Sequence, residues 1–265
     1  MRQRFAAQSV IEQLLRQQDA APGRSSVSRL FGRTPLGIDS VAWYVGARGE
    51  IAVGVILARL SPEWSVFHAL PVGNKDTDID HLVIGPGGIF TINTKHHSGK
   101  SIWVAGKTFL VSGQKKAYIA KSESEAANVT KLLRERMPQL LPARPIITLV
   151  DPKQITVKDK PQLVTVINAR DLRQWLTKLP AVLSAADVAE VDGLIDDPAF
   201  WRALPADIPE NLMGRFTELD FEVRSARTRR TLWAFAGIAA TIGLAIFALP
   251  PLTSAVGSLI LGLFS

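Results

Sequence analysis

The chain contains no cysteine among its 265 residues. Without cysteine it has no disulfide framework, no zinc–cysteine site and no thiol nucleophile, and a reducing, cytoplasmic setting is consistent with that composition. Histidine does not replace cysteine as a metal ligand. The histidines at 81, 96 and 97 lack the spacing of a zinc site, because adjacent residues of a strand point to opposite faces.

Two common sequence signals are also missing. Residues 1–20 lack the apolar run of a secretory signal and are typical of a short polar arm, either helical or poorly ordered. Glycines 85, 87 and 88 lack the GxxxxGK[ST] order of a phosphate-binding loop, so a turn is the better interpretation. The sequence therefore indicates neither secretion nor P-loop nucleotide chemistry.

Positive charge is in excess. The chain has 31 Lys and Arg against 24 Asp and Glu, which gives a formal net charge of +7 and a pI near 9.9. Such a balance favours acidic partners, either nucleic acid or an anionic membrane surface. Charge alone does not choose between the two.

The central part of the chain alternates short strands with helices. Residues 48–60 are apolar nearly all round, which predicts a buried helix with Glu50 in its first turn. Ser122 and Glu125 have capping-box spacing and predict the start of a second helix. Strands are expected at 64–72, 144–150, 154–159 and 162–168, and two more on either side of Gly106 within 100–113.

A β-hairpin is expected over residues 76–97. With the turn at 85–88, residues whose numbers add up to 173 lie opposite each other, so Asp80 faces Asn93 and Asp78 faces Lys95. Alternation along the strands places these four side chains on one face. Carboxylate and amide oxygens suit a hard cation such as Mg²⁺, and a nearby lysine suits a phosphate.

Simpler interpretations exist for each residue. Asp80 is also explained as a solvated carboxylate at a strand end, and Lys95 as an edge-strand lysine that opposes aggregation. Glu50 is also explained by the dipole of its helix. Asn93 is also explained as a buried amide that satisfies backbone groups.

The same stretch resembles a known family. The run DIDHLVIGPGGIF at 78–90, followed by TINTK at 91–95, is similar to the nuclease-related domain (NERD), and GARGE at 46–50 fits its pattern. The resemblance covers roughly residues 40–180. This family is related to the PD-(D/E)xK nucleases, so the resemblance implies an α/β fold: a restriction-endonuclease-like mixed sheet flanked by helices.

The resemblance also implies roles for individual residues. Asp80 matches a metal ligand, Lys95 the lysine of the catalytic element, and Glu50 the acid on the first helix that completes the metal site. Asn93 stands where the family has Asp or Glu, so it brings a ligand oxygen without charge, and metal affinity and catalysis should fall. The implied cofactor is Mg²⁺ or Mn²⁺, and the suggested accessory residues are Asp78, Gln114 and His96.

The end of the chain has a different character. Residues 231–249 are uncharged, and 19 residues make about 28 Å of helix, close to the thickness of a bilayer core. We expect one membrane span there, with Pro250 and Pro251 breaking or kinking it and a second span over 252–264 less favoured. Four arginines just before the span should stay on the cytoplasmic side: Arg224, Arg227, Arg229 and Arg230.

Together these expectations divide the chain and suggest a function. The expected segments are an arm and linker over 1–38, a NERD-like domain over 39–180, a helical and loop-rich extension over 181–228, and a membrane anchor over 229–265. The leading hypothesis is a protein of the cell membrane whose cytoplasmic domain binds nucleic acid, DNA before RNA, and cleaves phosphodiesters with a divalent metal. We expect no small-molecule cofactor. The alternatives are a catalytically silent nucleic-acid-binding module and a membrane-bound interaction protein that uses no nucleic acid.

Overall fold

The computed structural model describes residues 1–71, 78–201 and 211–262, with side chains described up to residue 245. The chain forms two compact units. One unit comprises Met1–Gln17 and Asp39–Met213, and the other comprises Gln18–Ile38 and Gly214–Ser265. The chain passes from the first unit to the second after Gln17, returns to the first at Asp39, and enters the second again after Met213.

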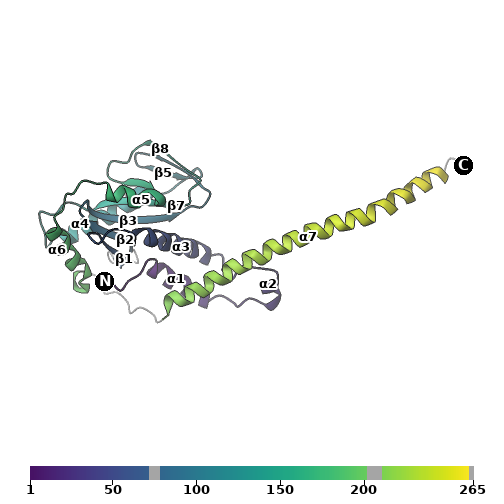
Figure 1. Cartoon of the computed structure of the whole chain (residues 1–265), viewed down its shortest axis with the longest axis horizontal. Coiled ribbons are helices and arrows are strands. Elements are labelled where there is room, and N and C mark those ends of the chain that lie inside the picture. Colours follow the sequence, from purple (N-terminus) through teal and green to yellow (C-terminus); the bar gives the residue numbers. More distant parts are fainter. Residues whose placement is uncertain (72–77, 202–210, 263–265) are drawn as a thin grey trace. The chain divides into compact units, whose positions relative to one another are not determined.

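A five-stranded mixed sheet forms the centre of the first unit (Figure 1). The strand order is β1-β2-β3-β7-β9, with β1, β2 and β3 antiparallel and β3, β7 and β9 parallel. β3 is therefore a central strand between an antiparallel and a parallel neighbour. The strands are β1 (Ser65–Pro71), β2 (Asp78–Gly85), β3 (Gly88–His96), β7 (Arg144–Val150) and β9 (Thr165–Asn168).

Helices cover both faces of this sheet. α3 (Ser40–Leu57) and α5 (Ala169–Thr177) share an apolar cluster with Val83, Phe90 and Ile92. α4 (Tyr118–Arg134) and α6 (Ala185–Asp196) share another cluster with Leu82, Ile84 and Ile89. Because side chains alternate along a strand, the two clusters lie on opposite faces of the sheet. The predicted mixed α/β architecture is confirmed.

A second, four-stranded sheet adjoins the first, in the order β6-β5-β4-β8. Its apolar residues pack with Ile147 and Leu149 of β7 and with Ile119 of α4. That contact explains why α4 begins at Tyr118: Ile119, 2% exposed, extends the buried face of the helix toward the N-terminus. The strands are β4 (Ser101–Ala105), β5 (Thr108–Val111), β6 (Gln114–Lys115) and β8 (Gln154–Asp159).

Two helix starts differ from the predictions. α4 begins before Ser122, so Ser122 and Glu125 are buried inside the helix and form no capping box. α3 begins at Ser40, which places Glu50 in the third turn. Interpreting Glu50 as a partner of the helix dipole is therefore wrong, because that effect fades beyond the first turn.

The N-terminal segment is helical, but it is not a loose arm. α1 (Gln8–Asp19) buries Ile11 and Leu14 completely. The terminal amine donates to the carboxylate of Asp196 over 2.7 Å, and Arg4 Nε donates to the carbonyl oxygen of Ala69 over 2.6 Å. The first residues of the chain are therefore part of the folded unit.

Two helices bear on the predicted membrane span. Among the described residues one helix, α3, is long and apolar enough to cross a membrane by length and composition, but it packs into the core of the first unit. α7 (Leu212–Gly262) is helical throughout, so of the break or kink expected at Pro250 and Pro251 the break is absent. The side chains after residue 245, including the last four of the span expected over 231–249 and all of 252–264, lie outside the described residues.

Candidate functional site

The candidate site lies on the β2–β3 hairpin, whose predicted register is confirmed as far as the His81–Ile92 pair, whereas the expected pairs Asp80–Asn93 and Asp78–Lys95 are not formed. Ile84 pairs with Ile89 and His81 pairs with Ile92, so the numbers of facing residues add up to 173. The turn needs glycine at 85, because a Cβ there would lie 2.3 Å from the Trp64 ring. The packing of the Trp64 ring on Gly85 thus helps to fix the position of the turn and, with it, the register of β2 and β3.

The two strands separate beyond the His81–Ile92 pair, where no further backbone pair of this hairpin is formed. There the Asp80 carboxylate accepts a hydrogen bond from the backbone N–H of Thr94, over 2.6 Å. The Asp80 side chain therefore accepts the hydrogen bond that a backbone carbonyl of β2 would otherwise accept from Thr94 of β3. This contact holds the carboxylate between the strands, and it makes the interpretation as a freely solvated strand-end residue wrong.

Three charged groups act on one another electrostatically at this opening. Glu50 comes from α3, Asp80 from β2 and Lys95 from β3. Burial raises the pKa of Glu50 well above its usual value, the charge of Asp80 raises it further, and Lys95 opposes both effects. Burial likewise raises the pKa of Asp80, while Lys95 and the Thr94 N–H lower it. Two carboxylates and one ammonium group are therefore within electrostatic reach of one another.

Lys95 is held by two contacts at the edge of the site. Its Nζ donates to the carbonyl oxygen of Thr94 over 3.1 Å and lies 5.2 Å from the centre of the Tyr118 ring. β3 pairs with β2 and with β7, so Lys95 does not lie on an edge strand of the sheet. The explanation of this lysine as an edge-strand guard against aggregation is therefore wrong.

Asn93 presents a free oxygen. Its Nδ2 donates to Glu125 Oε2 over 2.8 Å, and the residue is only 3% exposed. A carboxylate can only accept, so the NH₂ group faces Glu125 and the amide oxygen faces away. That oxygen, Oδ1, is buried without a hydrogen-bond partner among the described residues. A bound cation would satisfy it.

Glu125 is the site residue that sequence reasoning missed. It is 7% exposed, and its Oε1 lies 3.6 Å from Nζ of Lys121. Burial raises its pKa, the hydrogen bond from Asn93 lowers it, and the charge of Asp80 raises it. The available signal was helical spacing: Glu125 is four residues before Val129 and thus on the buried face of α4.

The three accessory residues lie in different places. Asp78 accepts from Ser9 Oγ and lies 3.6 Å from the Arg4 guanidinium, so it fastens the N-terminal segment beside the site. His96 is on the face opposite Lys95, where its Nδ1 is 3.0 Å from the carbonyl oxygen of Val45. Gln114 is exposed on β6 of the second sheet. The structure brings only Asp78 close to the carboxylates, through its charge effect on Glu50 and Asp80.

The donor set suits a hard divalent cation. Within the described ranges no group of three or more His, Cys, Asp or Glu side chains is placed to hold a metal. The available ligands are two carboxylates, on Glu50 and Asp80, and the partnerless amide oxygen of Asn93. Mg²⁺ commonly takes one or two carboxylates and keeps several water molecules. The residues present therefore fit such an ion.

Positive charge gathers near the end of β3. The pKa of His97 is lowered by burial and then by Lys95, His96, Lys116 and Lys100. Its ring stacks on Tyr118 at 5.8 Å between centroids. Of these lysines, Lys95 also acts on the carboxylates of Glu50 and Asp80, as does Lys121 of α4, and such groups attract phosphate.

Comparison with known families agrees with the geometry. A family model described as the nuclease-related domain matches residues 45–150, a range that contains the site from Glu50 to Glu125. Comparisons with curated proteins and with solved structures found no match. The resemblance inferred from residues 78–95 is confirmed.

Proposed function

From the premise that residues 45–150 carry a nuclease-related domain, we propose that the protein binds nucleic acid and cleaves phosphodiester bonds slowly with a divalent metal, while anchored to the cell membrane. The observation that carries the proposal is the mutual charge effect of Glu50, Asp80 and Lys95, with Asp80 held between the separated strands by the Thr94 N–H. A restriction-endonuclease-like arrangement of the sheet belongs to the same proposal.

Each residue has a role in it. Glu50, Asp80 and the Asn93 amide oxygen hold Mg²⁺ or Mn²⁺, and the bound cation supplies Lewis-acid activation and neutralises phosphate charge. Lys95 orients the attacking water or stabilises the charge that develops on the phosphate. The Thr94 N–H keeps the Asp80 carboxylate in place during these steps.

Glu125 compensates in part for the neutral residue at 93. Its hydrogen bond with Nδ2 fixes the Asn93 amide so that the oxygen is free for the metal. The negative charge nevertheless sits on Glu125 behind the proposed ligand Asn93, and Lys121 Nζ, 3.6 Å from Glu125 Oε1, partly neutralises it. Metal affinity is therefore lower than with an acid at 93, which is why we propose slow cleavage.

Nucleic acid is the proposed substrate because of the charge around the site. The lysines at 95, 100, 116 and 121 supply phosphate contacts, and the chain has a net charge of +7. Such contacts make affinity fall as salt rises. DNA is the favoured form.

The proposed anchor is α7. Nearly all described side chains from 231 to 245 are exposed and none is charged, which a helix in water does not favour. The arginines from 224 to 230 precede this stretch, and by the positive-inside rule they support the proposal that the nuclease-related domain lies in the cytoplasm. The proposed span covers residues 231–249.

A nuclease assay with labelled DNA tests the proposal. The full chain in detergent is incubated with Mg²⁺ or Mn²⁺, and Asp80→Ala is compared with Asp159→Ala, which removes an exposed acid of β8. We expect slow cleavage that Asp80→Ala abolishes and Asp159→Ala preserves. Cleavage that survives Asp80→Ala would show that this site is not the source.

The neutral amide at 93 also favours a second function, a binding module without cleavage. In that case the wild-type chain binds DNA in a salt-dependent manner but cleaves it with neither metal. Absence of both binding and cleavage would favour an interaction protein that uses no nucleic acid.

A further inference from the structure

The second unit contains an excursion of the chain, residues 18–38, that is fastened along the first part of α7. The excursion includes the short helix α2 (Ser26–Leu30). Its polar contacts with α7 are spread over several turns of that helix. They join Asp19 to Arg215, Arg24 to Glu222, the Arg29 carbonyl to Arg229 and the Leu30 carbonyl to Trp233.

Close packing fixes the level of this excursion on α7. Gly32 has φ +69°, and a Cβ on it would lie 2.5 Å from the Ala226 carbonyl oxygen and from the Arg230 nitrogen. The Phe31 ring lies 5.0 Å from the ring of Trp233. Phe31 and Gly32 thus lie beside the part of α7 where the arginines end, at Arg230, and the uncharged stretch begins.

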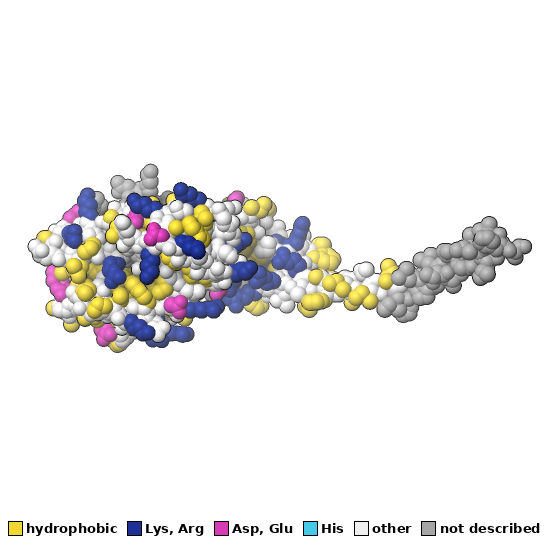
Figure 2. Space-filling model, turned by 90° about the horizontal axis from the view of Figure 1, so that it is seen from above, with side chains coloured by type: hydrophobic (Ala, Val, Ile, Leu, Met, Phe, Trp, Pro, Cys, Tyr) yellow, Lys and Arg dark blue, Asp and Glu magenta, His cyan; other side chains and the backbone are white. Residues whose placement is uncertain are grey.

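Apolar side chains are exposed at this level. Val27 is 64% exposed, Leu30 57% and Phe31 50%. Arg29, Arg33 and the two arginines at 229 and 230 lie among them. Figure 2 shows Lys and Arg side chains (dark blue) gathered ahead of the exposed apolar side chains (yellow) of α7. Apolar groups interleaved with arginines are typical of a surface that lies at a membrane interface.

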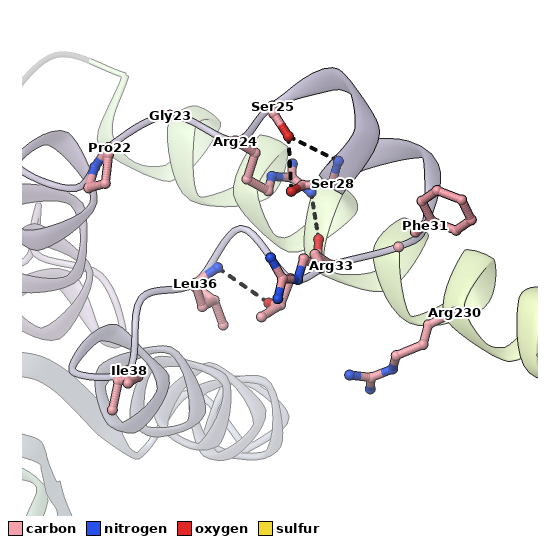
Figure 3. Close-up of a pocket in the computed structure, with 12 residues that line it drawn as sticks. Pro22, Gly23, Arg24, Ser25, Ser28, Phe31, Arg33, Leu36, Ile38 and Arg230 are labelled. Atoms are coloured by element: carbon pink, nitrogen blue, oxygen red, sulfur yellow. Dashed lines mark hydrogen bonds between the residues drawn. The ribbon is translucent and has the colours of Figure 1, made fainter.

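A basic pocket lies between the excursion and α7 (Figure 3). It has a volume of about 730 Å³, and none of its described lining residues is acidic. In Figure 3 the Arg230 side chain extends from α7 into the space below the loop that carries Arg33 and Leu36. Ser28 and Thr34 add hydroxyl groups to the lining, and Phe31 and Ile38 add apolar side chains. Guanidinium and hydroxyl groups beside apolar walls fit a phosphate ester with a hydrocarbon part.

We propose that residues 18–38 and the start of α7 form a docking collar for the anionic leaflet of the bilayer. Val27, Leu30 and Phe31 enter the boundary between headgroups and acyl chains, and Arg33 and Arg230 hold the phosphate of an anionic phospholipid. The proposal rests on the proposed span, because that span places Trp233 at the interface. A nucleic-acid phosphate is the weaker occupant, since the exposed apolar side chains would then stay in water.

Site-specific labels test the collar in the full chain, which has no cysteine of its own. Leu30→Cys reports the collar, Ile242→Cys the proposed span, and Leu163→Cys an exposed apolar position of the other unit, 68% exposed. Each spin-labelled chain is placed in nanodiscs that contain phosphatidylglycerol. Accessibility to oxygen and to a water-soluble nickel chelate then gives the depth of each label.

We expect the label at 242 in the hydrocarbon, the label at 30 at the headgroup level and the label at 163 in water. If the label at 242 is in lipid while the label at 30 is as accessible to nickel as the label at 163, the collar is wrong and the span stands. If the label at 242 is itself in water, the span fails and the collar fails with it.

The arginines are tested by changing the lipid. Replacing phosphatidylglycerol with phosphatidylcholine should move the label at 30 toward water. The double variant Arg33→Gln/Arg230→Gln should abolish this difference between the lipids, whereas Arg136→Gln/Lys160→Gln, which removes two exposed charges of the other unit, should preserve it. If the double variant keeps the lipid difference but loses binding of a DNA duplex, the pocket serves nucleic acid and the proposal is overturned.

Discussion

Asn93 donates a hydrogen bond from Nδ2 to Glu125 Oε2 over 2.8 Å, joining the central strand β3 to α4 in the buried site. This contact separates two properties that one acidic side chain usually combines. Asn93 supplies the oxygen, and Glu125 supplies the charge. The pair explains how a site with a neutral residue at 93 can still present a fixed ligand for a cation.

Removing the charge behind Asn93 should weaken the metal site. In Glu125→Gln the new amide can turn its own oxygen toward Nδ2, so the hydrogen bond persists while the charge is lost. We expect metal affinity to fall roughly tenfold, in the range known for residues that support a metal ligand. Titration calorimetry with Mn²⁺ measures it, with Glu123→Gln on the same helix as the control. Equal affinity in wild type and Glu125→Gln would show that Glu125 is only a packing residue.

Glu50 should cost stability at neutral pH in the metal-free protein. Burial is the largest cause of its raised pKa, so the folded chain binds this proton more tightly than the unfolded chain does. Stability therefore falls as the pH rises above the ordinary value of 4.5 toward the folded pKa. Glu50→Gln should raise the Tm at pH 7, and the gain should disappear below about pH 4.5.

The metal supplies a check on this account of Glu50. Saturating Mg²⁺ stabilises the state that binds it, so it should raise the Tm of the wild type more than that of Glu50→Gln. A Tm of Glu50→Gln below the wild-type value at pH 7 without metal would mean that the attraction to Lys95 outweighs the burial penalty.

Acid should destabilise the fold through a buried histidine pair. His68 Nδ1 lies 2.8 Å from His81 Nδ1, and burial lowers the pKa of His68 from 6.5 to about 4. The stability from the neutral ring is complete above pH 6.5 and is lost as the pH falls toward 4. The loss is about 3 kcal/mol for His68 alone. Urea unfolding of His68→Gln between these pH values should show a flatter curve than the wild type; identical curves would assign the acid sensitivity elsewhere.

The hairpin turn should tolerate no side chain at 85. A Cβ there would meet the Trp64 ring at 2.3 Å, so Gly85→Ala forces the ring or the strand to move. We expect a loss of about 1–3 kcal/mol in the free energy of unfolding, typical of overpacking. Denaturant melts measure it, with Gly99→Ala as a comparison for a glycine in open space, although its positive φ adds some strain. A Gly85→Ala protein as stable as the wild type would contradict the packing argument.

Local patterns in the sequence were enough to predict the hairpin and its register. Glycines at the turn and alternation along both strands define which residues face each other as far as His81 and Ile92, but the pairs expected beyond them, at Asp80 and Lys95, are not formed. The strand at 144–150 could also be predicted, because a continuous apolar run is typical of a strand covered on both faces.

Contacts between segments far apart in the sequence could not be predicted from local patterns. Glu125 is 32 residues from Asn93, and only the packing of α4 on the sheet brings the two together. The start of α4 depends on the second sheet, and the fastening of Ser9 to Asp78 depends on the position of α1. A capping pattern is short and frequent, so tertiary packing overruled it at Ser122.

The most direct test of the account exchanges the roles of residues 93 and 125. In Asn93→Asp/Glu125→Gln the carboxylate moves onto β3 and the amide onto α4, which keeps the hydrogen bond and brings the charge to the metal. We predict tighter Mn²⁺ binding and faster DNA cleavage than in the wild type, with the gain abolished by Asp80→Ala. Asn93→Asp alone should gain less, because two carboxylates would then meet at hydrogen-bond distance. Brisk cleavage by the wild type that the exchanged variant slows would contradict the account.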